Sequence, residues 1–154
     1  MKGRQRIRLD RNFFADEFIP PSMYQRYPDW MIVRRIPIQL VRAYQAVRDR
    51  HGARTLNDWW HGGNRNQSGL RIPGQGYYRE MASHSWCGAG DSVGVTPVQE
   101  IWEDIRKNYD RVYKPLGVTG IEVGRNISWL HLDLGNFQGL ARYSEGRLYE
   151  IIID

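Results

Sequence analysis

Two histidines and one aspartate stand in short segments whose composition suits a metal site. The segment Met81–Asp91 places His84 and Asp91 seven residues apart across a glycine-rich turn, and His131 lies in the segment Trp129–Leu134. Imidazole nitrogens and a carboxylate oxygen are ligands that Zn²⁺ accepts, and three protein ligands leave one coordination position for water. The sequence therefore predicts one catalytic Zn²⁺ per chain, bound by His84, Asp91 and His131.

A strand predicted over residues 127–134 would present His131. Apolar residues alternate along it with polar or aromatic ones: Leu130, Leu132 and Leu134 against Trp129, His131 and Asp133. Since successive side chains of a strand point to opposite faces, one face should pack on the core and the other should carry the site.

Two helices are expected to support this strand. The first covers residues 37–51, with apolar residues at helical spacing and a glycine stop at Gly52. The second covers 97–112 and begins at a capping box from Thr96 to Gln99, with a proline at its first position. The stretch Tyr24–Arg35 is predicted to be irregular.

The remaining segments predict short strands and one long loop. Residues 54–60 and 121–123 have strand-forming composition, and residues 140–143 and 147–153 read as a closing hairpin. The loop over residues 62–76 is rich in Gly, Asn and Gln, and a loop of that length in a small domain is often functional.

Length and charge restrict the classes of protein. A chain of 154 residues with 41% hydrophobic content predicts a single domain, 1–154, with a real core. Part of the net charge of +5 lies in a basic N-terminal arm, residues 1–11, which contains Lys2, Arg4, Arg6, Arg8 and Arg11. Such an arm could meet an anionic polymer or another protein, or form an edge strand. Nucleic acid is the weaker interpretation, because no zinc-finger or RNA-recognition spacing accompanies the arm.

Cysteine content and hydropathy add exclusions. Cys87 is the single cysteine, so no disulfide can form within the chain. The chain contains no run of about 18 apolar residues, so no membrane-spanning helix is predicted. The basic start is not followed by an apolar segment, so no secretory signal peptide is expected.

The two other histidines have simpler interpretations. His51 stands at a helix C-terminus, where a cation is favoured, and is expected to be structural. His61 could face a substrate, but simple exposure is the favoured interpretation. His84 or His131 alone would also read as structural, and only their combination with Asp91 indicates a site.

That combination resembles the zinc motif of the D-alanyl-D-alanine metallopeptidases, the M15 peptidase family, written roughly S-x-H-x-x-G-x-A-x-D. His84, Ala89 and Asp91 have the family spacing, whereas Ser83 is one position closer and Cys87 stands where the family has glycine. Upstream, the segment 68–71 is similar to the family's S-G-x-R segment. Downstream, the segment 129–133 is similar to the third-ligand strand, F-V-H-x-D, of the M15A C-terminal subgroup. The resemblance covers residues 12–135, with the C-terminal hairpin, 136–154, beyond it.

The resemblance implies roles for further residues. Many family members carry an acidic residue three positions before the last histidine, and Ser128 stands there in this chain. Asp133, which shares the strand face of His131, is the first choice for the general base, and Glu122 is the second. Arg71 would hold a substrate carboxylate or an oxyanion. The residues expected to bind substrate are Ser68, Arg71, Trp86 and Trp129.

The implied fold is α+β, a single hedgehog or D-Ala-D-Ala-peptidase-like domain with an antiparallel sheet and two main helices on one side. The implied function is a zinc peptidase that cleaves stem peptides or cross-links of peptidoglycan. Without a signal peptide, we expect a bacteriophage endolysin released from the host cytoplasm by a holin, or a virion-associated lysin. The alternative is an inactive structural or tail component of a virion, which could contact other virion proteins through the basic arm.

Overall fold

The computed structural model describes residues 4–80, 82–135 and 146–153 of the chain. These residues form an α+β fold with one five-stranded sheet in the order β1-β2-β4-β3-β5. The strands are β1 Arg54–Thr55, β2 Ala89–Gly94, β3 Gly120–Val123, β4 Leu130–Asp133 and β5 Tyr149–Ile152. The α+β prediction is thus confirmed at this level.

The sheet is mostly, but not wholly, antiparallel. Strand pairs β1/β2, β2/β4 and β3/β4 are antiparallel, whereas β5 runs parallel to β3. The prediction of a wholly antiparallel sheet is therefore wrong at β5. The first strand of the predicted closing hairpin, 140–143, lies outside the described residues.

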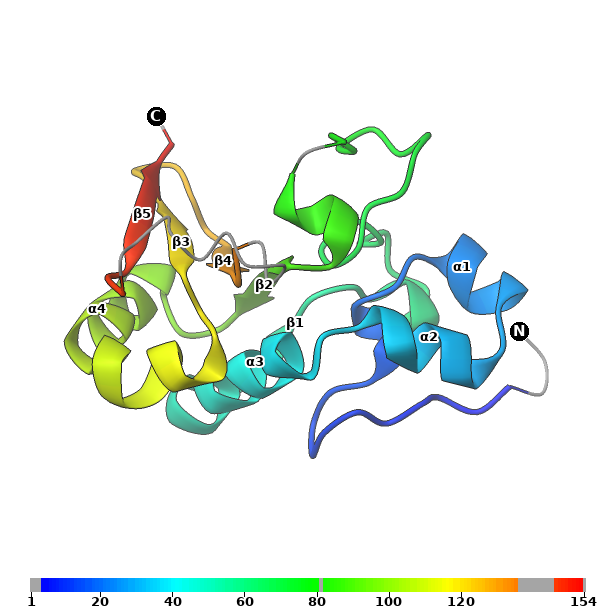
Figure 1. Ribbon diagram of the computed structural model, residues 1–154, viewed down its shortest axis with the longest axis horizontal. Coiled ribbons are helices and arrows are strands. Elements are labelled where there is room, and N and C mark those ends of the chain that lie inside the picture. The colour runs from blue at the N-terminus through cyan, green and yellow to red at the C-terminus, as the bar shows by residue number, and fades with distance from the viewer. Residues whose placement is uncertain (1–3, 81, 136–145, 154) are drawn as a thin grey trace.

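Four α-helices accompany the sheet among the described residues, with shorter helical turns between them. They are α1 Pro21–Arg26, α2 Asp29–Arg35, α3 Ile38–His51 and α4 Val98–Asn108. The 3-10 turns are η1 Ala15–Glu17, η2 Trp59–His61, η3 Ser83–Trp86 and η5 Lys114–Leu116, and η4 Tyr109–Tyr113 is a π-helical turn. Helices α1 and α2 lie at the end of the molecule opposite α4 (Figure 1). No helix of the described part is long and apolar enough to span a membrane.

The first predicted helix is confirmed almost to the residue. Helix α3 ends at His51, and Gly52 follows with a φ of 86°, a left-handed conformation that suits glycine. Its inner face is buried at Leu40, Val41, Tyr44 and Val47, whereas Ile38 is 42% exposed and lies outside the stripe.

The second predicted helix exists, but its capping box does not form. Helix α4 is continued by the π-helical turn to Tyr113. The Thr96 hydroxyl donates to the carbonyl oxygen of His51 at the end of α3, and no side chain caps α4. A tertiary hydrogen bond has thus replaced the local one.

Two other predictions are wrong. The stretch Tyr24–Arg35, predicted to be irregular, contains the second half of α1 and all of α2, and each of these helices follows a proline N-cap. The predicted strand over 54–60 is confirmed only at β1, and the chain then turns into η2. There Trp59 and Trp60 stack edge-on against the buried ring of Tyr24, a packing that a continued strand would not allow.

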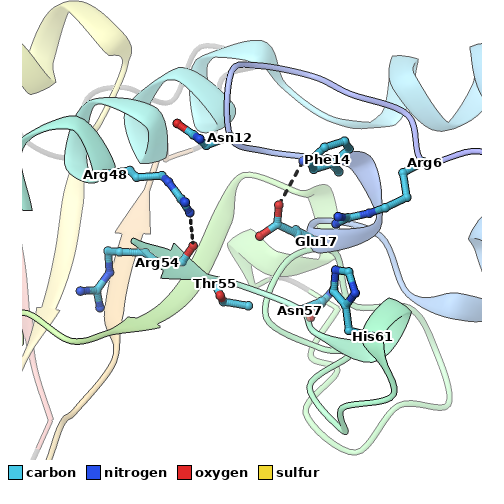
Figure 2. A pocket seen from close by; sticks show the side chains of 9 residues that line it. All are labelled: Arg6, Asn12, Phe14, Glu17, Arg48, Arg54, Thr55, Asn57 and His61. Atoms are coloured by element: carbon cyan, nitrogen blue, oxygen red, sulfur yellow. Dashed lines mark hydrogen bonds between the residues drawn. The ribbon is translucent and has the colours of Figure 1, made fainter. Parts of the chain in front are cut away.

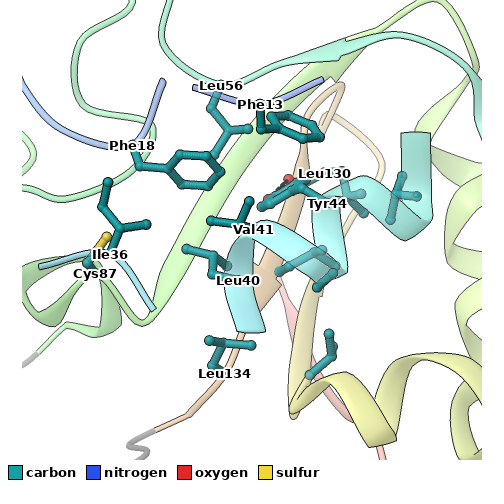
Figure 3. Packing of buried hydrophobic residues seen from close by; sticks show 14 of the residues in the cluster. Phe13, Phe18, Ile36, Leu40, Val41, Tyr44, Leu56, Cys87, Leu130 and Leu134 are labelled. Carbon is teal, nitrogen blue, oxygen red and sulfur yellow. Dashed lines mark hydrogen bonds between the residues drawn. The ribbon is translucent and has the colours of Figure 1, made fainter. Parts of the chain in front are cut away.

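The core lies between α3 and the sheet (Figure 3). The Tyr44 hydroxyl reaches the carbonyl oxygens of Gly90 on β2 and Leu130 on β4. A Cβ atom at Gly90 would come within 2.9 Å of the Tyr44 ring, so glycine permits this approach. Leu130, Leu132 and Leu134 are all buried, as the alternation predicted. The opposite face of β4 is thereby directed away from α3.

The described part of the basic arm lies against the body of the protein. Arg8 forms a single antiparallel bridge with Phe14, so the arm is not an extended edge strand. Arg6 pairs with the buried Asp16 at 2.6 Å, and Arg4 pairs with Asp29. Much of the basic charge that the sequence showed is therefore paired within the chain.

Candidate metal centre

Strand pairing places two of the candidate ligands side by side. In the register of β2 and β4, Asp91 lies directly opposite His131. Directly paired residues of an antiparallel ladder project from the same face, so the two side chains meet. His84 comes from η3, just before β2.

The three predicted ligands converge. Their potential ligand atoms all lie within 4.8 Å of one another. The Nδ1 atom of His131 is 2.8 Å from Asp91 Oδ1, and the Nε2 atom of His84 is 3.2 Å from Asp91 Oδ2. The imidazole rings are 5.3 Å apart between centroids. Both histidines are buried and Asp91 is partly buried, so the cluster is shielded from solvent.

A backbone carbonyl fixes the orientation of His84. Its Nδ1 atom lies 2.7 Å from the carbonyl oxygen of Gly69, which can only accept, so Nδ1 carries the hydrogen. The lone pair of Nε2 is then available on the side of Asp91, as metal-bound histidines require. A Cβ atom at Gly69 would lie 2.3 Å from the carbonyl oxygen of Phe18, so glycine lets this segment approach the core. This contact gives a physical reason for the glycine in the segment 68–71.

The turn after His84 contains an unusual backbone conformation. Cys87 has a φ of 59°, the left-handed region that favours glycine, and its side chain is fully buried. This is the position at which the resembling family has glycine. Burial raises the pKa of the Cys87 thiol to about 12.

The charges of the site depend strongly on one another. Burial alone would raise the pKa of Asp91, but hydrogen bonds and positive charge from His131 and His84 hold it well below its usual range. Burial alone would lower the pKa of His131, but the carboxylates of Asp133 and Asp91 raise it to about 10. Without a metal, His131 therefore holds a proton near neutral pH, which a metal ion must displace to use Nδ1.

Arg71 contacts the site from the long loop. Its Nη2 atom donates to Asp91 Oδ2 at 2.8 Å, and its Nε atom donates to the carbonyl oxygen of Gln67 at 2.8 Å. The guanidinium thus ties the loop to a candidate ligand and orients that carboxylate. Its predicted contact with substrate stays a prediction.

Asp133 and Glu122 both lie beside His131, on different sides of the ring. Asp133 Oδ2 is 3.6 Å from the Nε2 atom of His131, and Glu122 Oε1 is 3.8 Å from its Nδ1 atom. Ser128 is exposed and precedes β4. Sequence reasoning named both carboxylates, but it could not assign them to sides of the ring.

The other three residues predicted to bind substrate, besides Arg71, differ in accessibility. Trp86 is 46% exposed. Trp129 is partly buried and its indole N–H donates to Glu122 Oε2 at 3.3 Å. Ser68 is only 7% exposed, and its carbonyl oxygen accepts the backbone N–H of Asp91 at 2.7 Å. The structure thus makes Ser68 a support of β2.

The donor set fits a divalent metal ion. Two imidazole nitrogens and a carboxylate oxygen converge from three elements, and the Nδ1–H of His84 is held as a metal-bound histidine needs. Imidazole ligands suit zinc and other late first-row metals.

The other two histidines lie apart from this cluster. His51 pairs with Asp104 at 2.8 Å, in agreement with the structural role predicted for it. His61 is exposed and lines a separate pocket with Glu17 and Asn57 (Figure 2). In that pocket Glu17 accepts the backbone N–H of Phe14, and burial raises the pKa of Glu17 to about 7.

Comparison with protein-family models, with curated proteins and with solved structures gives no significant match to this chain. Functional conclusions therefore depend on the geometry of the site and on the sequence resemblance.

Proposed function

We propose that the protein is a zinc-dependent peptidase that hydrolyses peptide bonds of peptidoglycan. The observation that carries this proposal is the convergence of His84, Asp91 and His131, whose ligand atoms lie within 4.8 Å of one another. Their order and spacing also resemble the zinc motif of the M15 peptidase family, which acts on such substrates. Zinc bound there would act as a Lewis acid and lower the pKa of a coordinated water towards about 7.

Residues of the chain would orient the metal ligands, contact the substrate and transfer the proton. His84, held by the carbonyl oxygen of Gly69, and Asp91, held by Arg71, are preorganised as ligands. Trp86 supplies an exposed aromatic surface close to His84 in the chain, which suits contact with a substrate. A carboxylate beside His131 would accept a proton from the attacking water and return it to the leaving amine.

The proposed setting is a bacteriophage lysin, either an endolysin that reaches the wall through a holin or a virion-associated lysin. The exact bond would lie next to a D-amino acid or between L-Ala and D-Glu of the stem peptide. Both points extend the sequence resemblance.

The test combines metal analysis with digestion of purified muropeptides. We expect one zinc per chain and release of stem-peptide fragments, with both lost after chelation and restored by added zinc. His84→Ala serves as the inactive control. Zinc binding without any fragment release would overturn the peptidase proposal.

That outcome would favour a second function, a structural component of a virion. The observation behind it is Ser128, which stands where many members of the resembling family have an acidic residue. Such a protein would bind zinc for stability and contact other virion proteins.

A further inference from the structure

The two carboxylates beside His131 meet different nitrogens of its ring. We infer that Asp133 is a positioning residue that orients the imidazole, and that Glu122, held by Trp129, is the proton acceptor of the reaction. The second half of this inference rests on the proposed function, whereas the first half rests only on metal binding.

Both carboxylates reach the site because of the strand register. Ile121 on β3 pairs with the buried Leu132 on β4, and Gly120 pairs with Asp133. Since side chains alternate along each strand, Glu122 projects from the face of β3 that adjoins His131 and Asp133. The sheet therefore brings a carboxylate to either side of one imidazole.

Both carboxylate oxygens of Asp133 accept hydrogen bonds from the protein. Oδ2 accepts the hydroxyl of Ser83 at 2.8 Å, and Oδ1 accepts the backbone N–H of Gly135 at 2.5 Å. Oδ2 also lies 3.6 Å from His131 Nε2, a nitrogen without a hydrogen-bond partner among the described residues. Because Ser83 directly precedes His84, Asp133 connects the turn that carries one ligand to the ring of another.

This arrangement corresponds to the support that metal-bound histidines usually have. A carboxylate beside the non-ligating nitrogen fixes the tautomer and the angle of the ring. His131 Nδ1 faces Asp91, so Nε2 is the nitrogen left for such support. Asp133 therefore lies on the Nε2 side of the His131 ring, away from Nδ1 and the other converged donor atoms.

Glu122 lies on the other side of the ring. Its Oε1 atom is 3.8 Å from Nδ1, the nitrogen that faces Asp91, and accepts no hydrogen bond from the residues that the structure describes. Its Oε2 atom accepts the Trp129 indole N–H at 3.3 Å. The Glu122 side chain is also the more open of the two, 21% exposed against 15% for Asp133. Glu122 thus presents a free oxygen on the side where the donor atoms converge.

The reaction balances with these residues. The water oxygen bonds to the carbonyl carbon while Glu122 Oε1 takes one water proton. The C–N bond then breaks, and Glu122 returns that proton to the amine nitrogen. One water is consumed per bond, and Glu122 ends in its starting state.

The experiment compares Asp133→Asn and Glu122→Gln for zinc affinity, measured by competition with a chromophoric chelator, and for muropeptide hydrolysis at saturating zinc. Asp133→Asn should weaken zinc binding about 10–100-fold and regain most of its hydrolysis when zinc is saturating. Glu122→Gln should bind zinc as the wild type does and lose about 10²–10⁴-fold in kcat/KM. Glu150→Gln on β5, whose carboxylate pairs with Arg106, is the matched control and should change neither quantity.

Three milder variants keep the test decisive if Asp133→Asn or Glu122→Gln fails to fold. Ser83→Ala removes the hydrogen bond to Asp133 Oδ2 and should weaken zinc binding in the same direction. Trp129→Phe keeps the aromatic ring but removes the N–H that holds Glu122, so kcat should fall with little change in KM or zinc affinity. Glu122→Asp, which keeps the carboxylate, should retain part of the activity that Glu122→Gln loses.

A readout without hydrolysis separates this inference from the proposed function. Acetohydroxamate must give up its proton to bind zinc as an anion, so it reports a nearby proton acceptor even in a protein that cleaves no peptide. At saturating zinc, Glu122→Gln should weaken its binding about tenfold or more, and Asp133→Asn should not. Equal binding by wild type and Glu122→Gln overturns the role of Glu122. Unchanged zinc affinity in both Asp133→Asn and Ser83→Ala overturns the role of Asp133.

Discussion

The candidate metal centre and a second polar cluster contain the same residue types in different arrangements. The second, here named the Asp104 cluster, joins the end of α3 to α4 and consists of Asp104, Arg50, His51, Asn108 and Tyr113. The Asp104 carboxylate is the common acceptor of the cluster. It lies 2.8 Å from His51 and 2.6 Å from both Asn108 and Tyr113, and it also pairs with Arg50. Arg50 and its other partners hold the pKa of Asp104 well below its usual range.

At the candidate metal centre the carboxylate of Asp91 is shared instead between two imidazoles. Each oxygen faces a ring nitrogen, and the opposite nitrogen of His84 is held by a backbone carbonyl. At the Asp104 cluster only His51 could offer a nitrogen lone pair, since guanidinium, amide N–H and phenol groups donate. A histidine, an aspartate and an arginine in contact are therefore not enough. A metal site requires several lone pairs on one side, with the hydrogens held elsewhere.

The largest effect should come from removing one lone pair. His84→Ala should abolish stoichiometric zinc binding, because two remaining ligands hold zinc poorly. His51→Ala, the matched control in the Asp104 cluster, should still bind one zinc per chain. Zinc content measured after dialysis distinguishes the two, and a full complement in His84→Ala would show that the ligand set is wrong.

The pH dependence of zinc binding should depend on His131 and not on the Asp104 cluster. The pKa of His131 is raised from 6.5 to about 10, so its charge stabilises the metal-free protein fully below about pH 6.5, and this contribution is lost as pH rises through about 10. Zinc must displace that proton, so its Kd should rise about tenfold for each unit of decrease between about pH 9 and pH 7. Chelator competition across this range measures the slope. Asp104→Asn should keep the same slope, and a pH-independent Kd would contradict the proton on His131.

The Asp104 cluster should instead matter for folding. Asp104→Asn removes a charged acceptor of several hydrogen bonds and should lower the free energy of unfolding by about 2–3 kcal/mol at pH 7. Urea denaturation of the zinc-loaded protein measures this loss. Zinc content should remain at one per chain, and its loss would mean that the two regions are coupled.

The smallest effect concerns the two arginines. Arg71→Lys should weaken zinc binding about tenfold, because lysine cannot bond both Gln67 and Asp91 as the guanidinium does. Arg50→Lys is the control and should leave zinc affinity unchanged. If Arg71→Lys binds zinc normally but loses about tenfold in kcat/KM, the role in binding a substrate carboxylate is favoured instead.

The features that the sequence predicted well are those with a local cause. The apolar stripe and Gly52 located α3, and the alternation along β4 placed His131 and Asp133 on one face. Contacts between distant segments decided the rest. Thr96 bonds the end of α3 and so leaves α4 without its predicted cap. Periodicity also cannot distinguish a parallel strand from an antiparallel one, so the orientation of β5 was missed.

The candidate site followed the same rule. Residue type and spacing sufficed to name three candidate ligands that the structure brings together. The side of the imidazole that each carboxylate meets was not predictable, because it depends on the pairing of β3 with β4. The hydrogen bonds from His84 to the carbonyl oxygen of Gly69 and from Ser83 to Asp133 were also missed, although Gly69 and Ser83 both stood in the segments that carry the resemblance.

The strained turn at Cys87 has a consequence for measuring motion. The thiolate is the form that attacks alkylating reagents, and burial of Cys87 both suppresses its formation and makes the sulfur inaccessible. The single thiol of the chain should therefore react only when the segment between His84 and Asp91 opens. The alkylation rate of Cys87 therefore reports how often that segment opens. A metal ion bound by His84 and Asp91 should lower this rate without contacting the sulfur.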